Sequence, residues 1–162
     1  MLPARGSGTQ SILMARFPED LLPVREILRE YAASLDFQLC FQSFDQELAS
    51  LPGKYAPPAG ALLLARSGPE IAGIVALRPL DQHICEMKRL YTRPSHRGSG
   101  MGRALAQSIV DQARRIGYRA MRLDTVPQMA AAIGLYTSLG FRDIPPYCDN
   151  PIPGARYLEL RL

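Results

Sequence analysis

A glycine-rich stretch in the middle of the chain has the residue types of an anion-binding loop. Its glycines stand at alternate positions, Gly98, Gly100 and Gly102, between a predicted strand and a predicted helix. Because glycine has no Cβ, such a loop turns tightly and brings its backbone N–H groups close to a ligand. The first turn of the helix adds unpaired N–H groups and the positive end of the helix dipole. The spacing therefore predicts a site for a phosphate or pyrophosphate group.

Two familiar phosphate-binding motifs do not fit this loop. The P-loop pattern is G-x-x-x-x-G-K-[ST], but Gly98 is followed four residues later by Gly102, and no lysine comes next. The dinucleotide fingerprint G-x-G-x-x-G requires a glycine at the position of Arg103. The loop therefore argues against a nucleotide triphosphatase and against a dinucleotide-binding fold.

The cysteines predict neither a zinc site nor a thiol nucleophile. Cys40, Cys85 and Cys148 are odd in number and lack the close pairs typical of zinc sites. No motif ties His83 or His96 to Cys85 in the manner of a Cys–His pair. We therefore expect Cys85 to be a small buried side chain, no metal to be bound, and the thiols to be reduced in a cytoplasmic protein.

Composition limits the class of protein further. A chain of 162 residues with 47% hydrophobic residues is sufficient for one domain with a substantial core. The net charge of +4 is spread along the chain without a basic run, which argues against a nucleic-acid partner. Apolar runs such as 59–65 are shorter than the ~18 residues that span a bilayer. We expect residues 1–10 to be a flexible lead-in and residues 11–162 to form the domain.

The elements that position the loop follow from the hydrophobic periodicity. Strands are predicted at 11–17, 61–66, 71–77, 83–92, 118–125, 141–144 and 156–162. Helices are predicted over about four turns near 19–36 and at 44–51, 101–116 and 128–138, the last as an amphipathic helix. This order combines an antiparallel meander with a βαβ crossover, and it predicts an α+β or mixed α/β domain.

Two further motifs accompany the loop. Arg97 to Gly102 fits the pattern Arg/Gln-x-x-Gly-x-Gly/Ala, and residues 132–141 contain Leu-Tyr-x-x-x-Gly-Phe. Glu86 to Tyr91 and Leu123-Asp124-Thr125 also match. Through these motifs together the sequence resembles the GNAT superfamily of acetyl-CoA-dependent N-acetyltransferases. The resemblance implies a GNAT-like fold, in which a mixed, mainly antiparallel sheet with a splayed βαβ crossover is flanked by about four helices.

The resemblance also implies a binding site for acetyl-CoA as co-substrate. Backbone N–H groups of the loop would hold the pyrophosphate, and the strand before the loop would pair with the pantetheine arm and polarise the thioester carbonyl. The implied cofactor-binding residues are Leu90, Tyr91, Thr92, Arg97, Gly98, Ser99, Gly100, Met101, Gly102 and Arg103.

Two catalytic residues are implied in the same way. Glu86 would take a proton from the acceptor amine, and Tyr136 would protonate the departing CoA thiolate. Strand alternation alone leaves two orientations of Glu86 open, one facing the acceptor and one facing solvent beside Lys88 or Arg122. The ring of Tyr136 could also serve only as core packing.

The chain departs from the family pattern at Met129, where many members have an asparagine that bonds the pantetheine. Asp124, Thr125 or Gln128 could replace that contact. The acceptor side matches no specificity motif. Its candidate lining residues are Phe37, Phe41, Phe44, Arg78, Tyr147 and Asn150.

The resulting expectation is an N-acetyltransferase that moves an acetyl group from acetyl-CoA to a primary amine of a small molecule or amino acid. The amine would attack directly within a ternary complex. Two alternatives stay open at this point, namely a non-catalytic acyl-CoA-binding or sensing domain and the acetylation of a protein or peptide amine. A homodimer is also possible.

Overall fold

The computed structural model describes residues 9–37 and 43–162. The predicted lead-in therefore lies almost wholly outside the described residues, as do Cys40 and Phe41. Gln10, which we expected in the lead-in, already belongs to the first strand.

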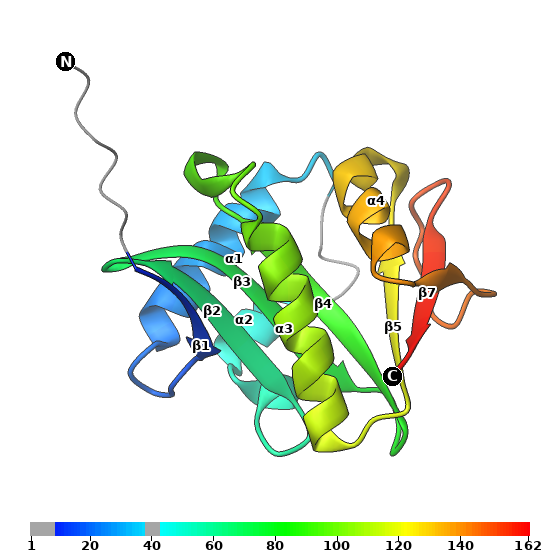
Figure 1. Cartoon of the computed structure of the whole chain (residues 1–162), viewed down its shortest axis with the longest axis horizontal. Coiled ribbons are helices and arrows are strands. Elements are labelled where there is room, and N and C mark those ends of the chain that lie inside the picture. The colour runs from blue at the N-terminus through cyan, green and yellow to red at the C-terminus, as the bar shows by residue number, and fades with distance from the viewer. Residues whose placement is uncertain (1–8, 38–42) are drawn as a thin grey trace.

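One seven-stranded sheet forms the centre of the molecule, in the order β1-β2-β3-β4-β5-β7-β6 (Figure 1). Every neighbouring pair is antiparallel except β4 and β5, which are parallel. The mixed, mainly antiparallel sheet that we predicted is thus confirmed. The strands are β1 Gln10–Met14, β2 Ala61–Ser67, β3 Glu70–Pro79, β4 Ile84–Thr92, β5 Ala120–Thr125, β6 Arg142–Asp143 and β7 Arg156–Arg161.

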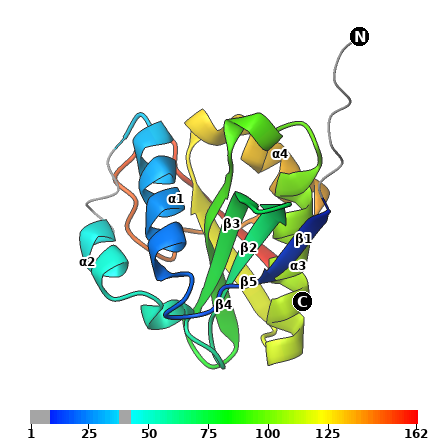
Figure 2. The same ribbon diagram turned by 90° about the vertical axis from the view of Figure 1, so that its left-hand side faces the viewer.

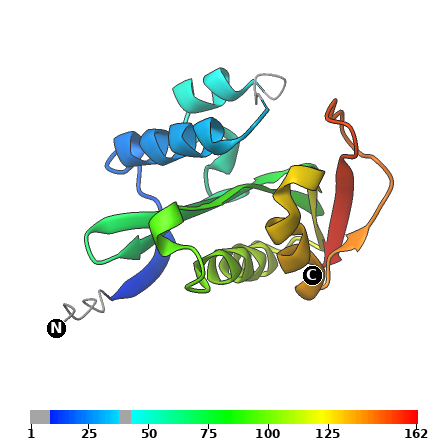
Figure 3. The ribbon, with the colours of Figure 1, turned by 90° about the horizontal axis from the view of Figure 1, so that it is seen from above.

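Helices cover both faces of the sheet. The α-helices of the described residues are α1 Leu21–Ser34, α2 Phe44–Ala49, α3 Met101–Ile116 and α4 Ala130–Ser138. Short 3-10 turns, η2 Gly53–Tyr55, η3 Pro94–His96 and η4 Pro127–Met129, lie between them. Figure 2 shows α1 and α2 on one side of the sheet and α3 on the other. Seen from above, α4 lies on the same side as α3 (Figure 3).

The two helical layers bury two separate cores. On one face, Leu105, Ile109 and Ala113 of α3 pack against alternate residues of the central strands. On the other face, Ile27 and Leu28 of α1 pack against the intervening residues of the same strands. Because both faces of β3 are covered, residues 71–77 form a continuous apolar run.

Some predicted boundaries differ from the structure. Strand β1 ends at Met14, and the chain then turns so that Asp20 accepts hydrogen bonds from the backbone N–H of Arg16 (2.8 Å) and from Arg66 (3.0 Å). Helix α4 starts two residues later than predicted, after the turn η4. Its sequence AAAIGLYTS is apolar around most of the helix, so the amphipathic helix that we predicted there is wrong.

The parallel pair β4 and β5 opens into a splay. Only residues 84–86 of β4 pair with 120–122 of β5, and beyond them the strands separate (Figure 1). A β-bulge in β4 accompanies this opening, because Lys88 pairs with Ala76 whereas Tyr91 pairs with Ile74. The extra residue Arg89 has a φ of +61°, which is uncommon for a residue other than glycine. The upper half of β4 therefore faces the splay with backbone groups that β5 does not pair.

The remaining sequence predictions concern burial and membrane contact. Cys85 is fully buried and its thiol lies 3.7 Å from the carbonyl oxygen of Ala120, as expected for a small core side chain. Burial raises the pKa of this thiol to about 12. In the described part of the chain, no helix has the length and apolar character that a membrane crossing requires.

Candidate active site

The glycine loop joins the end of β4 to the start of α3. Gly98 and Gly100 have φ values of +77° and +83°, which side chains with a Cβ rarely adopt. A Cβ added at either position would meet no atom within 4 Å, so the space in front of the loop is open. Gly100 directly precedes α3, whose first N–H groups have no intrahelical partner. This geometry suits an anion that is held by backbone N–H groups.

The Arg97 side chain is used to brace the loop. Its Nε donates to the carbonyl oxygen of Thr92 (3.2 Å), and its guanidinium lies 5.9 Å from the centre of the Tyr91 ring. The Tyr91 side chain is itself buried, and its hydroxyl contacts the Glu30 carboxylate at 3.2 Å. Tyr91 therefore offers only backbone groups to a ligand.

Other loop side chains make contacts within the protein. The Ser99 hydroxyl donates to the carbonyl oxygen of His96, and Arg103 donates to the Ser138 hydroxyl of α4 (2.7 Å). The side chain of Met101 is buried in the core beneath α3. Among the predicted cofactor-binding residues, Ser99 and Met101 therefore contribute to the loop mainly through their backbone. Arg103 contributes by tying α3 to α4.

A cavity, here called the β4–β5 cavity, lies where the two strands separate. It is lined by Tyr31, Phe37, Met87, Lys88, Arg89, Leu90, Leu123, Asp124, Thr125, Val126, Met129, Tyr136 and Asn150. Of the proposed substitutes for the family asparagine, Asp124 and Thr125 are in this lining, whereas Gln128 is exposed on η4. The Thr125 hydroxyl is buried and has no hydrogen-bond partner among the described residues. A buried unpaired hydroxyl costs free energy, so this oxygen is suited to a ligand in the cavity.

Tyr136 of α4 reaches the same cavity. Its ring is buried and packs against Phe141 at 5.7 Å between ring centres, so it also contributes to the core. Its hydroxyl has no hydrogen-bond partner within residues 9–37 and 43–162. Burial raises the pKa of this phenol above its ordinary value, because the phenolate would lose its hydration. The phenol therefore keeps its proton at neutral pH and is a suitable proton donor.

Glu86 is buried on β4, with 1% of its surface exposed. Arg78 Nε donates to Oε1 at 2.9 Å, the Tyr147 hydroxyl donates to Oε2 at 2.6 Å, and Lys88 Nζ lies 3.9 Å from Oε1. The solvent-facing orientation that the sequence left open is thus wrong. Arg122, the other partner considered, pairs instead with Glu159 at 2.7 Å.

The titratable groups around Glu86 are hydrogen-bond donors to its carboxyl group or lie close to it. Burial, followed by the charge of Glu86, raises the pKa of Tyr147, so this phenol stays a hydrogen-bond donor. Burial also lowers the pKa of Lys88, an effect that the Glu86 carboxylate opposes. Glu86 is therefore enclosed by donors from β3, β4 and the segment between β6 and β7.

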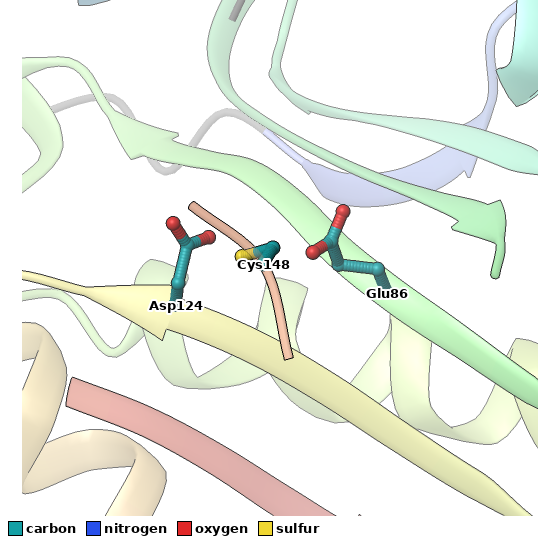
Figure 4. Close-up of side chains that lie close together, drawn as sticks. All are labelled: Glu86, Asp124 and Cys148. Carbon is teal, nitrogen blue, oxygen red and sulfur yellow. The ribbon is translucent and has the colours of Figure 1, made fainter. Parts of the chain in front are cut away.

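Two further side chains lie close to Glu86. Figure 4 shows the side chains of Asp124 on β5, Cys148 on the segment that follows β6 and Glu86 on β4 close together, with the Cys148 sulfur directed toward Asp124. The ligand atoms of the three residues lie within 4.8 Å of one another. Desolvation, with the carboxylates of Asp124 and Glu86, raises the pKa of the Cys148 thiol to about 11. The cluster thus combines two acidic side chains with a thiol that keeps its proton at neutral pH.

The predicted acceptor residues fall into different groups. Phe37 and Asn150 line the β4–β5 cavity, whereas Arg78 and Tyr147 hold Glu86. The guanidinium of Arg89 lies 5.2 Å from the centre of the Phe44 ring, and Phe44 does not line the cavity. The remaining candidate, Phe41, is outside the described residues.

Sequence reasoning missed Arg89. This buried arginine donates from Nε and Nη2 to the two oxygens of Glu47, both at 3.0 Å, and so ties β4 to α2. The ion pair holds the bulge at the floor of the cavity. No sequence signal could have revealed it, because an arginine with positive φ depends on tertiary contacts.

Comparisons with known proteins identify the family of this chain. The model of the Acetyltransferase (GNAT) family matches residues 22–141. An uncharacterized N-acetyltransferase of Schizosaccharomyces pombe is 40% identical over 94% of this chain and 94% of its own length. This chain belongs to the GNAT acetyltransferase family, and it is therefore an acyltransferase.

Solved structures show the same fold. An acetyltransferase from Streptococcus agalactiae superimposes with a TM-score of 0.77 at 21% identity, covering 94% of this chain and 98% of that chain. YncA of Salmonella typhimurium, a putative acetyltransferase solved with its cofactor acetyl-CoA, gives a TM-score of 0.70 at 23% identity, covering 94% of this chain and 93% of that chain.

Proposed function

We propose that this protein transfers the acetyl group of acetyl-CoA to a primary amine of a small molecule or amino acid. The observation that carries the proposal is the β4–β5 cavity, which contains a phenol and an unpaired buried hydroxyl and opens beside the glycine loop's strand. The amine attacks the thioester directly while both substrates are bound.

The residues of this chain fit acetyl-CoA in two places. The N–H groups from Arg97 to Gly102 meet the pyrophosphate, which needs several converging donors and no metal. The backbone of Leu90 to Thr92, which β5 does not pair, bonds the pantetheine arm as an added strand would. An N–H group of the bulged strand polarises the thioester carbonyl and stabilises the oxyanion.

Two side chains move protons in this proposal. The acceptor arrives as an ammonium, gives one proton to Glu86, and attacks the carbonyl carbon with the freed electron pair. The tetrahedral intermediate collapses with cleavage of the C–S bond, and Tyr136 donates its proton to the leaving thiolate. The second N–H proton then restores Tyr136. The balance is one acetylated amine, one CoA thiol and one released proton.

The cellular setting and the oligomeric state are part of the same proposal. We propose a cytoplasmic protein, since Cys85 and Cys148 of the described residues carry free thiols. The homodimer stays a prediction, which light scattering of the purified full chain tests.

The direct test combines binding and turnover. Calorimetry should show acetyl-CoA binding to the full chain, and free CoA thiol should appear when primary amines, amino acids or short peptides are added. Tight binding without thiol release from any acceptor would favour a sensing domain. Thiol release with peptides alone would favour acetylation of a protein amine.

A further inference from the structure

We propose that Asp124 binds the ammonium group of the acceptor, so that the site selects primary amines that arrive as cations. The inference rests on the proposed acetyl transfer and names the residue that receives the acceptor. It separates two tasks, since Asp124 holds the ammonium and Glu86 takes the proton.

Asp124 is held with one oxygen free. It lines the β4–β5 cavity from β5, and its Oδ2 accepts a hydrogen bond from Asn150 Nδ2 at 3.0 Å. The Asn150 amide is itself oriented, because its Oδ1 accepts from the N–H of Ile152 at 3.0 Å. No described residue donates to Asp124 Oδ1. A fixed carboxylate with a free oxygen therefore lines the cavity in which we propose that the acceptor meets the thioester.

The Asp124 carboxylate and its neighbour Cys148 can be matched to the donors of an ammonium. An ammonium has three N–H donors and no acceptor. Asp124 Oδ1 thus offers an unpaired acceptor to one of the three, and the neutral thiol sulfur of Cys148 is a weak second within the cluster of Figure 4.

The same cluster suits a divalent metal ion less well. Both Glu86 oxygens already accept hydrogen bonds, from Arg78 and Tyr147, and Lys88 adds a nearby positive charge. A monovalent cation with N–H donors matches the remaining unpaired oxygen of Asp124 better.

Asp124→Asn removes the charge and keeps the shape. Because a hydrogen bond to a charged group is worth about 1.5–3 kcal/mol, the KM for the amine should rise about ten- to hundredfold. The dissociation constant of acetyl-CoA should stay unchanged, since the glycine loop and β4 hold that molecule in this proposal and an asparagine can still make the pantetheine contact for which Asp124 is a candidate. The matched control is Asp111→Asn on the exposed side of α3, which should leave both values unchanged.

The experiment measures thiol release from the full-length variants with 2-phenylethylamine, cadaverine, glycinamide and L-phenylalanine. A second variant, Asn150→Ala, should raise the KM less than Asp124→Asn, because the carboxylate keeps its charge and loses only its orientation. An unchanged KM in Asp124→Asn would overturn the inference. Loss of wild-type activity in EDTA that Zn²⁺ restores would also overturn it. If the wild-type protein acetylates none of the four amines, the proposed acetyl transfer itself fails. If the wild type is active and Asp124→Asn has an unchanged KM, only the inference about Asp124 fails.

Discussion

Glu86 illustrates how a buried charge is accommodated at a site. A carboxylate removed from water is costly unless it is paired and hydrogen-bonded. Here Arg78 and Tyr147 satisfy its two oxygens, and Lys88 contributes at longer range. The same contacts fix the direction of the carboxylate. They also bring the segment between β6 and β7 over the cavity, and that segment carries Tyr147, Cys148 and Asn150.

Glu86→Gln should lower kcat about 10²- to 10⁴-fold, which is the usual contribution of a general base. The acidic limb of the pH–rate profile should disappear, because the amide does not titrate. The rate of CoA thiol release, measured between pH 5 and pH 9, reports both effects. Glu70→Gln, an exposed change at the start of β3, is the matched control. An unchanged profile would remove Glu86 from the role of base.

Tyr136→Phe should lower kcat about 10²-fold or more, because a phenylalanine ring keeps the packing on Phe141 and lacks the proton. Since burial raises the pKa of Tyr136, the wild-type rate should not fall through ionisation of this phenol until the pH exceeds about 10, its reference value. Tyr118→Phe, which removes a hydrogen bond to Ala59 away from the cavity, is the control. Equal kcat values in the two variants would contradict the role of Tyr136.

At the scale of elements, β4 does most of the positioning. Its first residues pair with β5 and place Glu86, and the bulge at Arg89 then turns the strand away. The last residues face the splay with unpaired backbone and lead directly into the glycine loop. One strand therefore connects Glu86, the proposed position of the thioester and the glycine loop that we propose holds the pyrophosphate.

Gly100→Val tests the loop at this scale. Valine is strained at a φ of +83° and would place a side chain in the open space before α3, so the affinity for acetyl-CoA should fall at least about tenfold. Gly117→Val is a matched control, because Gly117 also has a positive φ, +109°, but ends α3 at its opposite end. Calorimetry measures both affinities. Equal weakening in both variants would show that strain alone accounts for the loss.

For the whole molecule, the structure predicts one cooperative unit. The central strands belong to both cores, since alternate residues of β2, β3 and β4 face α1 or α3. Neither helical layer has a sheet of its own to pack on. The domain that we predicted over residues 11–162 should therefore unfold in a single step.

Ile27→Ala and Ile109→Ala test this cooperativity from opposite faces of the sheet. Both side chains are fully buried, so each variant should lose about 2–5 kcal/mol of the free energy of unfolding. The two losses should add to within about 0.5 kcal/mol, because the residues belong to different cores. Denaturant unfolding followed by circular dichroism measures them. Two separate transitions in wild type would contradict a single domain.

Much of the fold could be predicted from local signals in the sequence. Helix α3 has the predicted bounds, because its apolar spacing and Gly117 are both local features. The hairpin of β2 and β3 follows from two apolar runs that a short turn separates. The glycine loop was also recognisable, since positive φ at Gly98 and Gly100 requires residues without a Cβ.

Only the tertiary structure decided how the site is assembled. Alternation along β4 could not orient Glu86, and its burial depends on Arg78 from β3 and on Tyr147 from 61 residues further along the chain. The bulge at Arg89 depends on Glu47 of α2, which no local pattern relates to β4. The sequence alone thus determined the elements and the anion loop, because their causes are short-range. The cavity and its carboxylates are set by packing between distant segments.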